Sequence, residues 1–250
     1  RLVEAAALSD CRPVTGDWGR RGACWLASAQ LGLSDLFLGL ACLGCQRLGT
    51  AWCDECVRAA LAPSLTELHH GRVVASAAQY AGAVQRALIA HKERGQLVLA
   101  RPLGVLLSEA VRLFPTDGAV TLIPCPSTPR AIRVRGQDHA RRVTLRAVRE
   151  LVSSGRRAEC RSVIEISRGV VDQVGLTAAE RTANLTGAFV AKGPRRQDRR
   201  AIIVDDVTTT GSTLDEAWRA LTASGWSVIG AAVVARAGPR TGVADPASLG

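Results

Sequence analysis

Residues 201–213, AIIVDDVTTTGST, constrain the fold more than any other part of this 250-residue chain. The apolar run at 201–204 contains three β-branched residues and no polar alternation. Such a run predicts a short strand buried on both faces, as in a parallel sheet covered by helices. Asp205 and Asp206 follow at its carboxyl end, where open α/β sheets bind their ligands. The segment therefore predicts an α/β fold with a candidate site at this strand.

A turn rich in hydroxyl groups follows the two acids. Gly211 permits a positive φ in the turn and lets backbone N–H groups converge on an anion. The turn therefore predicts a phosphate site formed by Thr208, Thr209, Thr210, Gly211, Ser212 and Thr213. In the alternative interpretation, the acids cap the next helix and the threonines make only local turn hydrogen bonds.

A helix and a second strand are predicted after the turn. Gly225 marks the end of a helix whose apolar face comprises Leu214, Ala217, Trp218 and Leu221. Residues 226–235 are the strand, so the three elements form one βαβ unit and the turn lies at a helix N-terminus. Two carboxylates beside a phosphate site suit a sugar phosphate, because they accept hydrogen bonds from vicinal hydroxyls. A Walker P-loop is excluded, since its Gly-Lys-Ser/Thr ending is missing from the turn.

Four cysteines near the start of the chain form two CxxC pairs. Seven residues separate the pair Cys42 and Cys45 from the pair Cys53 and Cys56. Two such pairs complete a tetrahedral sulfur site, which favours a structural zinc ion. The alternatives are disulfides, which a cytosolic chain disfavours, and four free thiols. We interpret the isolated cysteines at 125 and 160 as small core residues.

The basic composition of the chain bears on its partners. The formal net charge is +10, and only two of the 32 basic residues are lysines. This balance favours polyanionic partners such as nucleic acids or phosphorylated ligands, although a coding bias toward arginine explains it equally well. The longest apolar stretch of the first fifth, residues 31–43, is too short to span a bilayer. We therefore expect a cytoplasmic protein without membrane insertion.

Further cations precede and follow a second predicted strand. Lys92 lies between two predicted helices, as a solvated helix end or as a contact to pyrophosphate. Residues 118–124 are the strand, and three prolines stiffen the loop that follows it. The end of this loop carries Arg130, Arg133 and Arg135, whose guanidinium groups suit phosphate oxygens. A solvated basic face is the alternative for this loop.

Residues 155–200 are the least regular part of the predicted α/β domain. A strand is predicted at 162–166, and a long excursion follows it. Long loops inside compact α/β units are often lids. We therefore interpret this excursion as a mobile flap whose polar groups are Arg168, Gln173, Arg181 and Asn184.

Taken in order, these motifs resemble the ComF family, the amidophosphoribosyltransferase-like competence proteins. The resemblance runs from about residue 33 to residue 236 and includes the cysteine pairs, YAGAVQRALIAHKERG, IPCPSTPRAIRVRG, QVGLTAAERTANLTGAF and IIVDDVTTTGST. Residues 135–139 read RGQDH where the family typically has Arg-Gly-Phe-Asn-Gln, and Val170 stands where a threonine is frequent.

The resemblance implies a type I phosphoribosyltransferase: a twisted, mostly parallel sheet flanked by helices, with a small N-terminal zinc-knuckle module. It implies phosphoribosyl pyrophosphate (PRPP) as ligand and Mg²⁺ as cofactor, besides Zn²⁺ at the cysteines. Asp205 and Asp206 would then orient the ribose, and residues 208–213 would hold the 5′-phosphate. The pyrophosphate would contact Lys92, Arg130, Arg133 and Arg135.

Thr209 stands where purine-type enzymes of this superfamily commonly place an aspartate, so an acceptor that needs strong general-base help is disfavoured. The expected organisation is an extension at 1–32, the zinc module at 33–65, the phosphoribosyltransferase domain at 66–240 and a tail at 241–250. Two functions compete for this chain. The first is phosphoribosyl transfer to an unidentified acceptor, and the second is non-catalytic PRPP binding with handling of single-stranded DNA, as in competence.

Overall fold

The computed structural model describes residues 40–68, 71–116, 118–167, 185–194 and 200–238. The chain divides into two contact units, Arg1–Leu40 and Ala41–Gly250. Every element described below belongs to the second unit. The predicted extension at 1–32 and the predicted flap residues 168, 173, 181 and 184 lie outside the described residues.

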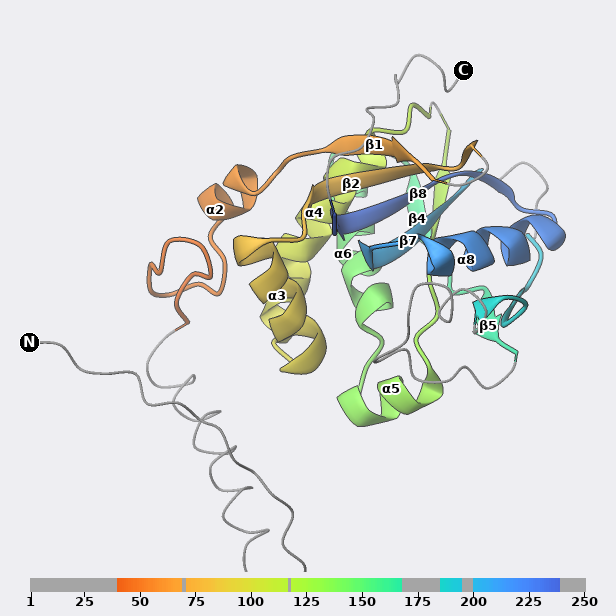
Figure 1. Ribbon diagram of the computed structural model, residues 1–250. Helices are drawn as coiled ribbons and strands as arrows, with labels where there is room; N and C mark the ends of the chain where they lie inside the picture. Colours follow the sequence, from red (N-terminus) through yellow and green to blue (C-terminus); the bar gives the residue numbers. More distant parts are fainter. Residues whose placement is uncertain (1–39, 69–70, 117, 168–184, 195–199, 239–250) are drawn as a thin grey trace, which may run out of the picture. The chain divides into compact units, whose positions relative to one another are not determined.

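A six-stranded, mostly parallel sheet forms the centre of this unit (Figure 1). Only the edge pair β1–β2 is antiparallel, and every other neighbouring pair is parallel. The spatial order is β1 (Ser64–Glu67), β2 (Val73–Gln79), β8 (Ser227–Arg236), β7 (Arg200–Thr208), β3 (Val120–Pro124) and β4 (Ala158–Cys160). The structure thus confirms the predicted α/β class.

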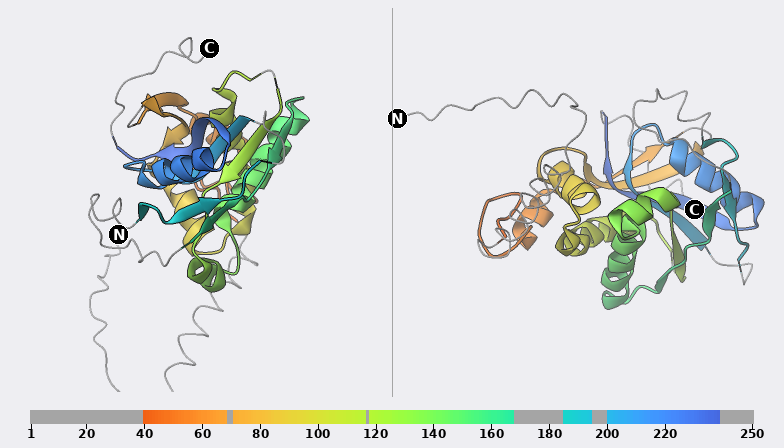
Figure 2. Two further views of the ribbon diagram at one scale, coloured as in Figure 1. Left: turned by 90° about the vertical axis from the view of Figure 1, so that its right-hand side faces the viewer. Right: turned by 90° about the horizontal axis from the view of Figure 1, so that it is seen from below.

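Helices cover both faces of the sheet. Helices α4 (Ala100–Arg112) and α6 (His139–Ser153) pack on one face, and α8 (Ser212–Ala223) packs on the other (Figure 2). The remaining elements are α2 (Asp54–Ala59), α3 (Gly82–Glu93), η2 (Leu97–Leu99), α5 (Pro129–Arg135) and a separate antiparallel pair, β5 (Ile164–Ile166) with β6 (Phe189–Ala191). No helix in the described part of the chain is both long and apolar enough to cross a bilayer.

The predicted βαβ unit is present as β7, α8 and β8. Ile202 and Ile203 are fully buried in β7, as expected for a strand covered on both faces. The strand continues through both acids and ends at Thr208, so Thr208 is the last strand residue rather than part of the turn. The strand after α8 runs from Ser227 to Arg236, close to its predicted bounds.

The topology creates a binding crevice between β3 and β7. The chain leaves β7 through α8 on one face and reaches β8, whereas it leaves β3 through α6 on the opposite face and reaches β4. Connections that depart to opposite faces from neighbouring parallel strands open a crevice at the carboxyl ends of those strands. The fold therefore brings the residues after β3 beside the acids of β7.

The arginine-rich segment after β3 is a helix, and the prediction of a proline-stiffened loop was wrong there. The Thr128 side chain accepts a hydrogen bond from the backbone N–H of Ala131 at 3.1 Å and so caps helix α5. Pro129 occupies its first turn, where a missing N–H costs nothing. Gly136 ends the helix with φ +72°. A Thr-Pro start and a glycine stop are helix signals that outweighed the prolines in this segment.

Candidate functional site

The four cysteines of the two CxxC pairs converge on one point. Their sulfur atoms all lie within 4.8 Å of one another, and Cys53 Sγ is 3.6 Å from Cys42 Sγ and 3.8 Å from Cys45 Sγ. Four sulfur ligands about 2.3 Å from a tetrahedral zinc ion are separated by about 3.8 Å. The cluster of Cys42, Cys45, Cys53 and Cys56 therefore fits a closed, structural zinc site, and all four are free cysteines in this structure.

Backbone N–H donors favour the thiolate form of the buried Cys42 sulfur. The N–H groups of Gly44 and Cys53 donate hydrogen bonds to Cys42 Sγ at 3.4 Å and 3.3 Å. Burial raises the pKa of the Cys42 thiol, but these backbone donors outweigh it and lower the pKa to about 6. The thiolate is the form that binds metal.

Asp205 and Asp206 form the centre of a second, separate site at the end of β7. The Asp206 N–H donates to Asp205 Oδ1 at 2.8 Å, and the Val207 N–H donates to Asp206 Oδ1 at 2.8 Å. The ammonium of Lys92, from the last turn of α3, lies 2.9 Å from Asp206 Oδ2. Lys92 was predicted as a pyrophosphate contact, and here it is the ion-pair partner of an acid.

The two acids differ in protonation because only one has this cation. Burial raises the pKa of Asp205 to about 7, and the neighbouring Asp206 charge adds to the increase. Burial also opposes ionisation of Asp206, but Lys92 and the backbone donors outweigh it and hold the pKa of Asp206 below its ordinary value. The Asp206 carboxylate in turn raises the pKa of Lys92. At neutral pH the pair thus combines a charged carboxylate with one that is partly protonated.

The predicted phosphate turn encloses a small cavity of about 50 Å³ at the start of α8. Gly211 has φ +84° and precedes the helix, whose first turn lacks a side-chain cap at that position. The Thr208 hydroxyl oxygen is buried at this cavity without a hydrogen-bond partner among the described residues. The free N–H groups of a helix start and an unpaired hydroxyl are the groups that hold a phosphate.

Glycine is favoured at 211 by the backbone. Its positive φ disfavours other residues. A Cβ built there would lie 2.5 Å from the Cδ1 atom of Leu68, so the Leu68 side chain would have to move.

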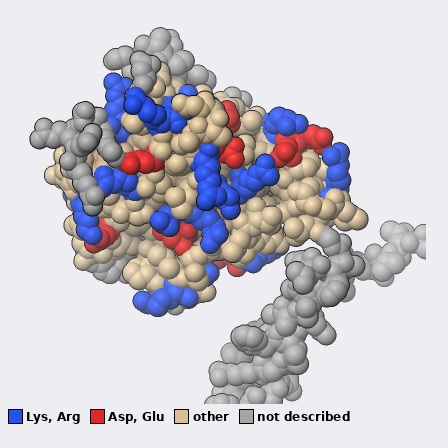
Figure 3. Space-filling model, turned by 180° about the vertical axis from the view of Figure 1, so that it is seen from behind, with Lys and Arg blue, Asp and Glu red and all other residues tan. Residues whose placement is uncertain are grey.

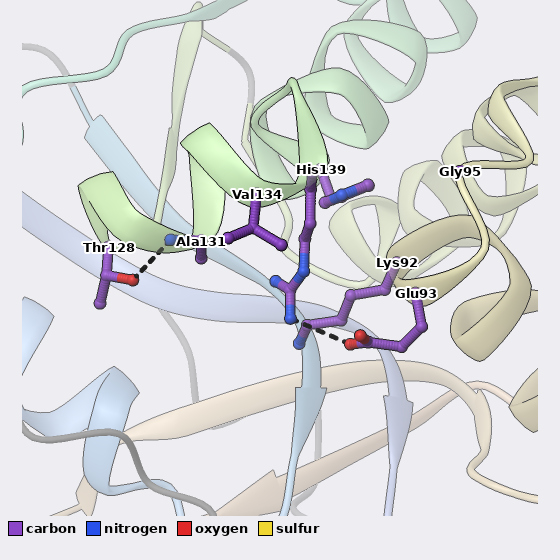
Figure 4. Close-up of a pocket in the computed structure, with 8 residues that line it drawn as sticks. Lys92, Glu93, Gly95, Thr128, Ala131, Val134 and His139 are labelled. Atoms are coloured by element: carbon purple, nitrogen blue, oxygen red, sulfur yellow. Dashed lines mark hydrogen bonds and ion pairs between the residues drawn. The ribbon is translucent and has the colours of Figure 1, made fainter. Parts of the chain in front are cut away.

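The acids and the turn open into a larger cavity of about 420 Å³. Its opposite wall comes from the segment after β3 and from α3, including Ser127, Thr128, Arg135 and Lys92. A neighbouring cavity of about 470 Å³ shares Lys92, Thr128 and Arg135 with it (Figure 4). Arg135 forms an ion pair with Glu93 at 3.0 Å, so α5 and α3 are joined across this second cavity.

The structure brings most, but not all, of the predicted site residues together. The cavity of about 420 Å³ is lined by Lys92, Arg135, Asp205, Asp206, Thr209 and Thr213, and the small cavity of about 50 Å³ is lined by residues 208–213. Arg133 is exposed on α5 and lines neither cavity. For Arg130 the structure gives the backbone position on α5 but not the side chain.

Two residues that were not predicted as site residues line the cavity of about 420 Å³. Cys125 is a buried core residue, as interpreted, and it also lines this cavity; burial and the nearby acids Asp205 and Asp206 raise its pKa. His139 also lines the cavity, as the first residue of α6. The Asp138 side chain accepts a hydrogen bond from the Arg141 N–H and so caps the start of α6. An aspartate is a common helix cap, so the sequence does contain a signal that His139 begins a helix.

Replacing Gly44 tests the zinc site. A Cβ at this position would lie 2.6 Å from Cys56 Sγ, so Gly44→Ala displaces a ligand. We expect zinc affinity to fall about tenfold or more, measured by competition with a chromophoric chelator. Gly118→Ala is the control, because a Cβ there meets no atom within 4 Å. Equal zinc binding by the wild type and both variants contradicts the account.

Replacing Asp205 tests the electrostatics of the acid pair. The folded protein keeps a proton on Asp205 up to about pH 7, whereas the unfolded chain loses it near pH 3.8. Wild-type stability therefore falls as pH rises through this window, and Asp205→Asn removes the loss. We expect the variant to gain on the order of 4 kcal/mol over the wild type between pH 4 and pH 8, measured by urea unfolding.

Asp206→Asn is the matched variant with the opposite sign. Since the pKa of Asp206 is lowered, its stabilising contribution is present above pH 4 and is lost only as pH falls further. This variant should be less stable than the wild type at neutral pH. A pH-independent difference for Asp205→Asn disproves the assignment of the raised pKa.

One comparison with known protein families matches the part of the chain that contains the acids and the turn. Residues 145–246 match the phosphoribosyl transferase domain family, a segment that contains β7, the phosphate turn, α8 and β8. A search of curated proteins found no match. Among solved structures, the chain is similar to a hypoxanthine phosphoribosyltransferase from Staphylococcus aureus at 10% identity and a TM-score of 0.28, over 73% of this chain and 80% of that one. Similarity at that level supports no argument, whereas the family match covers the acids and the turn themselves.

Proposed function

We propose that this protein binds PRPP with magnesium and transfers its phosphoribosyl group to an acceptor, with release of pyrophosphate. The observation that carries the proposal is the cavity of about 420 Å³, in which the acid pair faces cations on one side and the phosphate turn on the other. The phosphoribosyl transferase domain match over 145–246 supports it. Because its motifs resemble those of the ComF family, we propose that the protein is a phosphoribosyltransferase of that family.

In this proposal the 5′-phosphate occupies the small cavity of the turn. The turn offers the backbone N–H groups at the start of α8, the Thr208 hydroxyl and the hydroxyls of Thr209 and Thr213. The partial positive charge of the helix N-terminus favours an anion there. The small size of the cavity suits one phosphate group and excludes a nucleobase.

The ribose then lies over Asp205 and Asp206. Their carboxylate oxygens accept hydrogen bonds from the vicinal hydroxyls and stabilise positive charge that develops at the anomeric carbon. Asp205 gives up its proton when the ligand and its metal arrive. The Lys92 ammonium leaves Asp206 and contacts a pyrophosphate oxygen instead. The Arg135 guanidinium likewise leaves Glu93 for the pyrophosphate.

The residues present fit magnesium, because carboxylate oxygens at the cavity are the hard ligands this ion prefers. Asp205 and Asp206 would hold it near the ribose, while pyrophosphate and ribose hydroxyls supply most of its ligands. When bound, magnesium supplies positive charge that neutralises the leaving group. The proposal also keeps the predicted flap, with Arg168, Gln173, Arg181 and Asn184 closing over the ligand.

A second candidate function is the binding of single-stranded DNA. Helix α6 carries Arg141, Arg142, Arg146 and Arg149, and none of them pairs with a carboxylate in the part of the chain that the structure describes. Figure 3 shows basic side chains gathered in a band on the side of the molecule away from α8, with acidic ones between them. Unpaired arginines on one helix suit a phosphate backbone.

Titration of PRPP with magnesium into the purified protein tests the first function. We expect micromolar affinity, about −8 kcal/mol, in isothermal calorimetry, lost when Asp205→Asn and Asp206→Asn are combined. Asp215→Asn is the control, because this acid belongs to the same βαβ unit but pairs with Arg72 at 2.6 Å and lines neither cavity of the site. A folded, zinc-loaded wild type that does not bind PRPP contradicts the proposal.

Salt dependence tests the second function. If α6 binds DNA, the affinity for a single-stranded oligonucleotide should fall steeply with ionic strength, and Arg142→Gln with Arg146→Gln should weaken it and reduce the salt slope by about 1.4, since each phosphate contact to a single strand contributes about 0.7. Fluorescence anisotropy measures both quantities. Binding that the double variant leaves unchanged argues against this surface.

A further inference from the structure

His139 is a buried histidine on the wall of the candidate site. It is the first residue of α6, its exposed fraction is 5%, and it lines both the cavity of about 420 Å³ and its neighbour of about 470 Å³. Figure 4 shows its ring among the side chains that surround the second cavity, together with Lys92 and Thr128. A histidine in this position faces whatever enters the site.

The His139 ring has no hydrogen-bond partner in the described part of the chain. Neither Nδ1 nor Nε2 contacts a donor or acceptor among the residues described. Buried polar atoms are normally paired, so an unpaired imidazole at a cavity wall indicates a place for a ligand. His91 differs in that its Nδ1 lies 3.1 Å from the Gln96 carbonyl oxygen, although its Nε2 is also without a partner among the described residues, and in that its side chain lines neither cavity. The two rings meet edge to face with their centres 5.0 Å apart.

Charged groups from three elements surround His139. Helix α3 contributes Lys92, Glu93 and the ring of His91, α5 contributes Arg135, and β7 contributes Asp205 and Asp206. Burial is the main cause that lowers the pKa of His139; His91, Arg135 and Lys92 lower it further, and Asp206 opposes them. The ring is therefore neutral at pH 7 in the ligand-free protein. The two cations, Lys92 on α3 and Arg135 on α5, with a helix N-terminus beside them, favour a multiply charged anion.

We propose that His139 contacts the diphosphate group of PRPP, donating a hydrogen bond to a phosphate oxygen and taking up a proton as the diphosphate binds. The inference rests on the proposed function, because it places the diphosphate on the side of Lys92 and Arg135. Ala140, the next residue of α6, lines the same cavity, so the start of this 15-residue helix is also directed at the ligand. The proton comes from solvent, and no covalent bond changes.

Histidine NMR spectra test the proton uptake directly. The chain has four histidines, so the side-chain nitrogen signals can be assigned with His139→Gln and His91→Gln. A bound anion within about 4–6 Å raises the pKa of an imidazole by about 1–3 units. We expect inorganic pyrophosphate to raise the titration midpoint of His139 by at least one such unit, and that of His91 by less. An unchanged midpoint in protein saturated with pyrophosphate overturns the proposal.

Affinity as a function of pH provides the second readout. Glutamine keeps a hydrogen-bond donor at 139 but cannot take up the proton. The ratio of pyrophosphate affinities, wild type over His139→Gln, should therefore rise about tenfold between pH 8 and pH 6. Protonation of pyrophosphate itself changes both affinities equally, so it cancels in this ratio. If His139→Gln unfolds, His139→Asn replaces it, and the NMR titration of the wild type still decides.

The outcomes separate this inference from the proposed function. Normal binding of PRPP that depends on Asp205 and Asp206, with a silent His139, overturns only the role of His139. Binding of neither PRPP nor pyrophosphate overturns both.

Discussion

The site depends on the neutralisation of two adjacent carboxylates at the end of a buried strand. Charges removed from water are costly unless they are paired and hydrogen bonded. Here Lys92 of α3 pairs with Asp206 at 2.9 Å, and the backbone of β7 supplies two N–H donors. Asp205 has no ion-pair partner among the described residues and stays partly protonated, with a pKa of about 7. One acid is thus neutralised by an ion pair and the other in part by its own proton.

Helix α3 joins this pair to the cysteine module. Near its start, the Arg86 side chain donates a hydrogen bond at 2.7 Å to the Leu43 carbonyl oxygen, between the first two cysteines. Its last turn carries Lys92. The sheet topology forms the other wall of the site. The connections after β3 and β7 leave on opposite faces of the sheet, so the starts of α5, α6 and α8 lie at one crevice. A zinc ion that orders the module would in this way stabilise helix α3. That helix carries Lys92, the one cation paired with this acid pair among the described residues.

Local patterns predicted much of the fold and the centre of the site. The β-branched run before Asp205, the hydroxyl-rich turn and the apolar spacing of α8 were sufficient to predict the βαβ unit, because each is a local property of the chain. Contacts between distant segments were not predictable in this way. Lys92 and Asp206 are 114 residues apart, and His139 contacts the ring of His91 on α3, which is 48 residues before it. At α5, prolines were given more weight than the Thr128 cap and the Gly136 stop. The flap residues remain predictions.

A crystal structure of the protein with PRPP and magnesium tests the central claim most directly. The account predicts the 5′-phosphate in the turn at residues 208–213, the ribose hydroxyls on Asp205 and Asp206, and Lys92 moved from Asp206 to the diphosphate. Density for PRPP elsewhere on the protein, or in the crevice with Lys92 still paired to Asp206 and the turn empty, would contradict it.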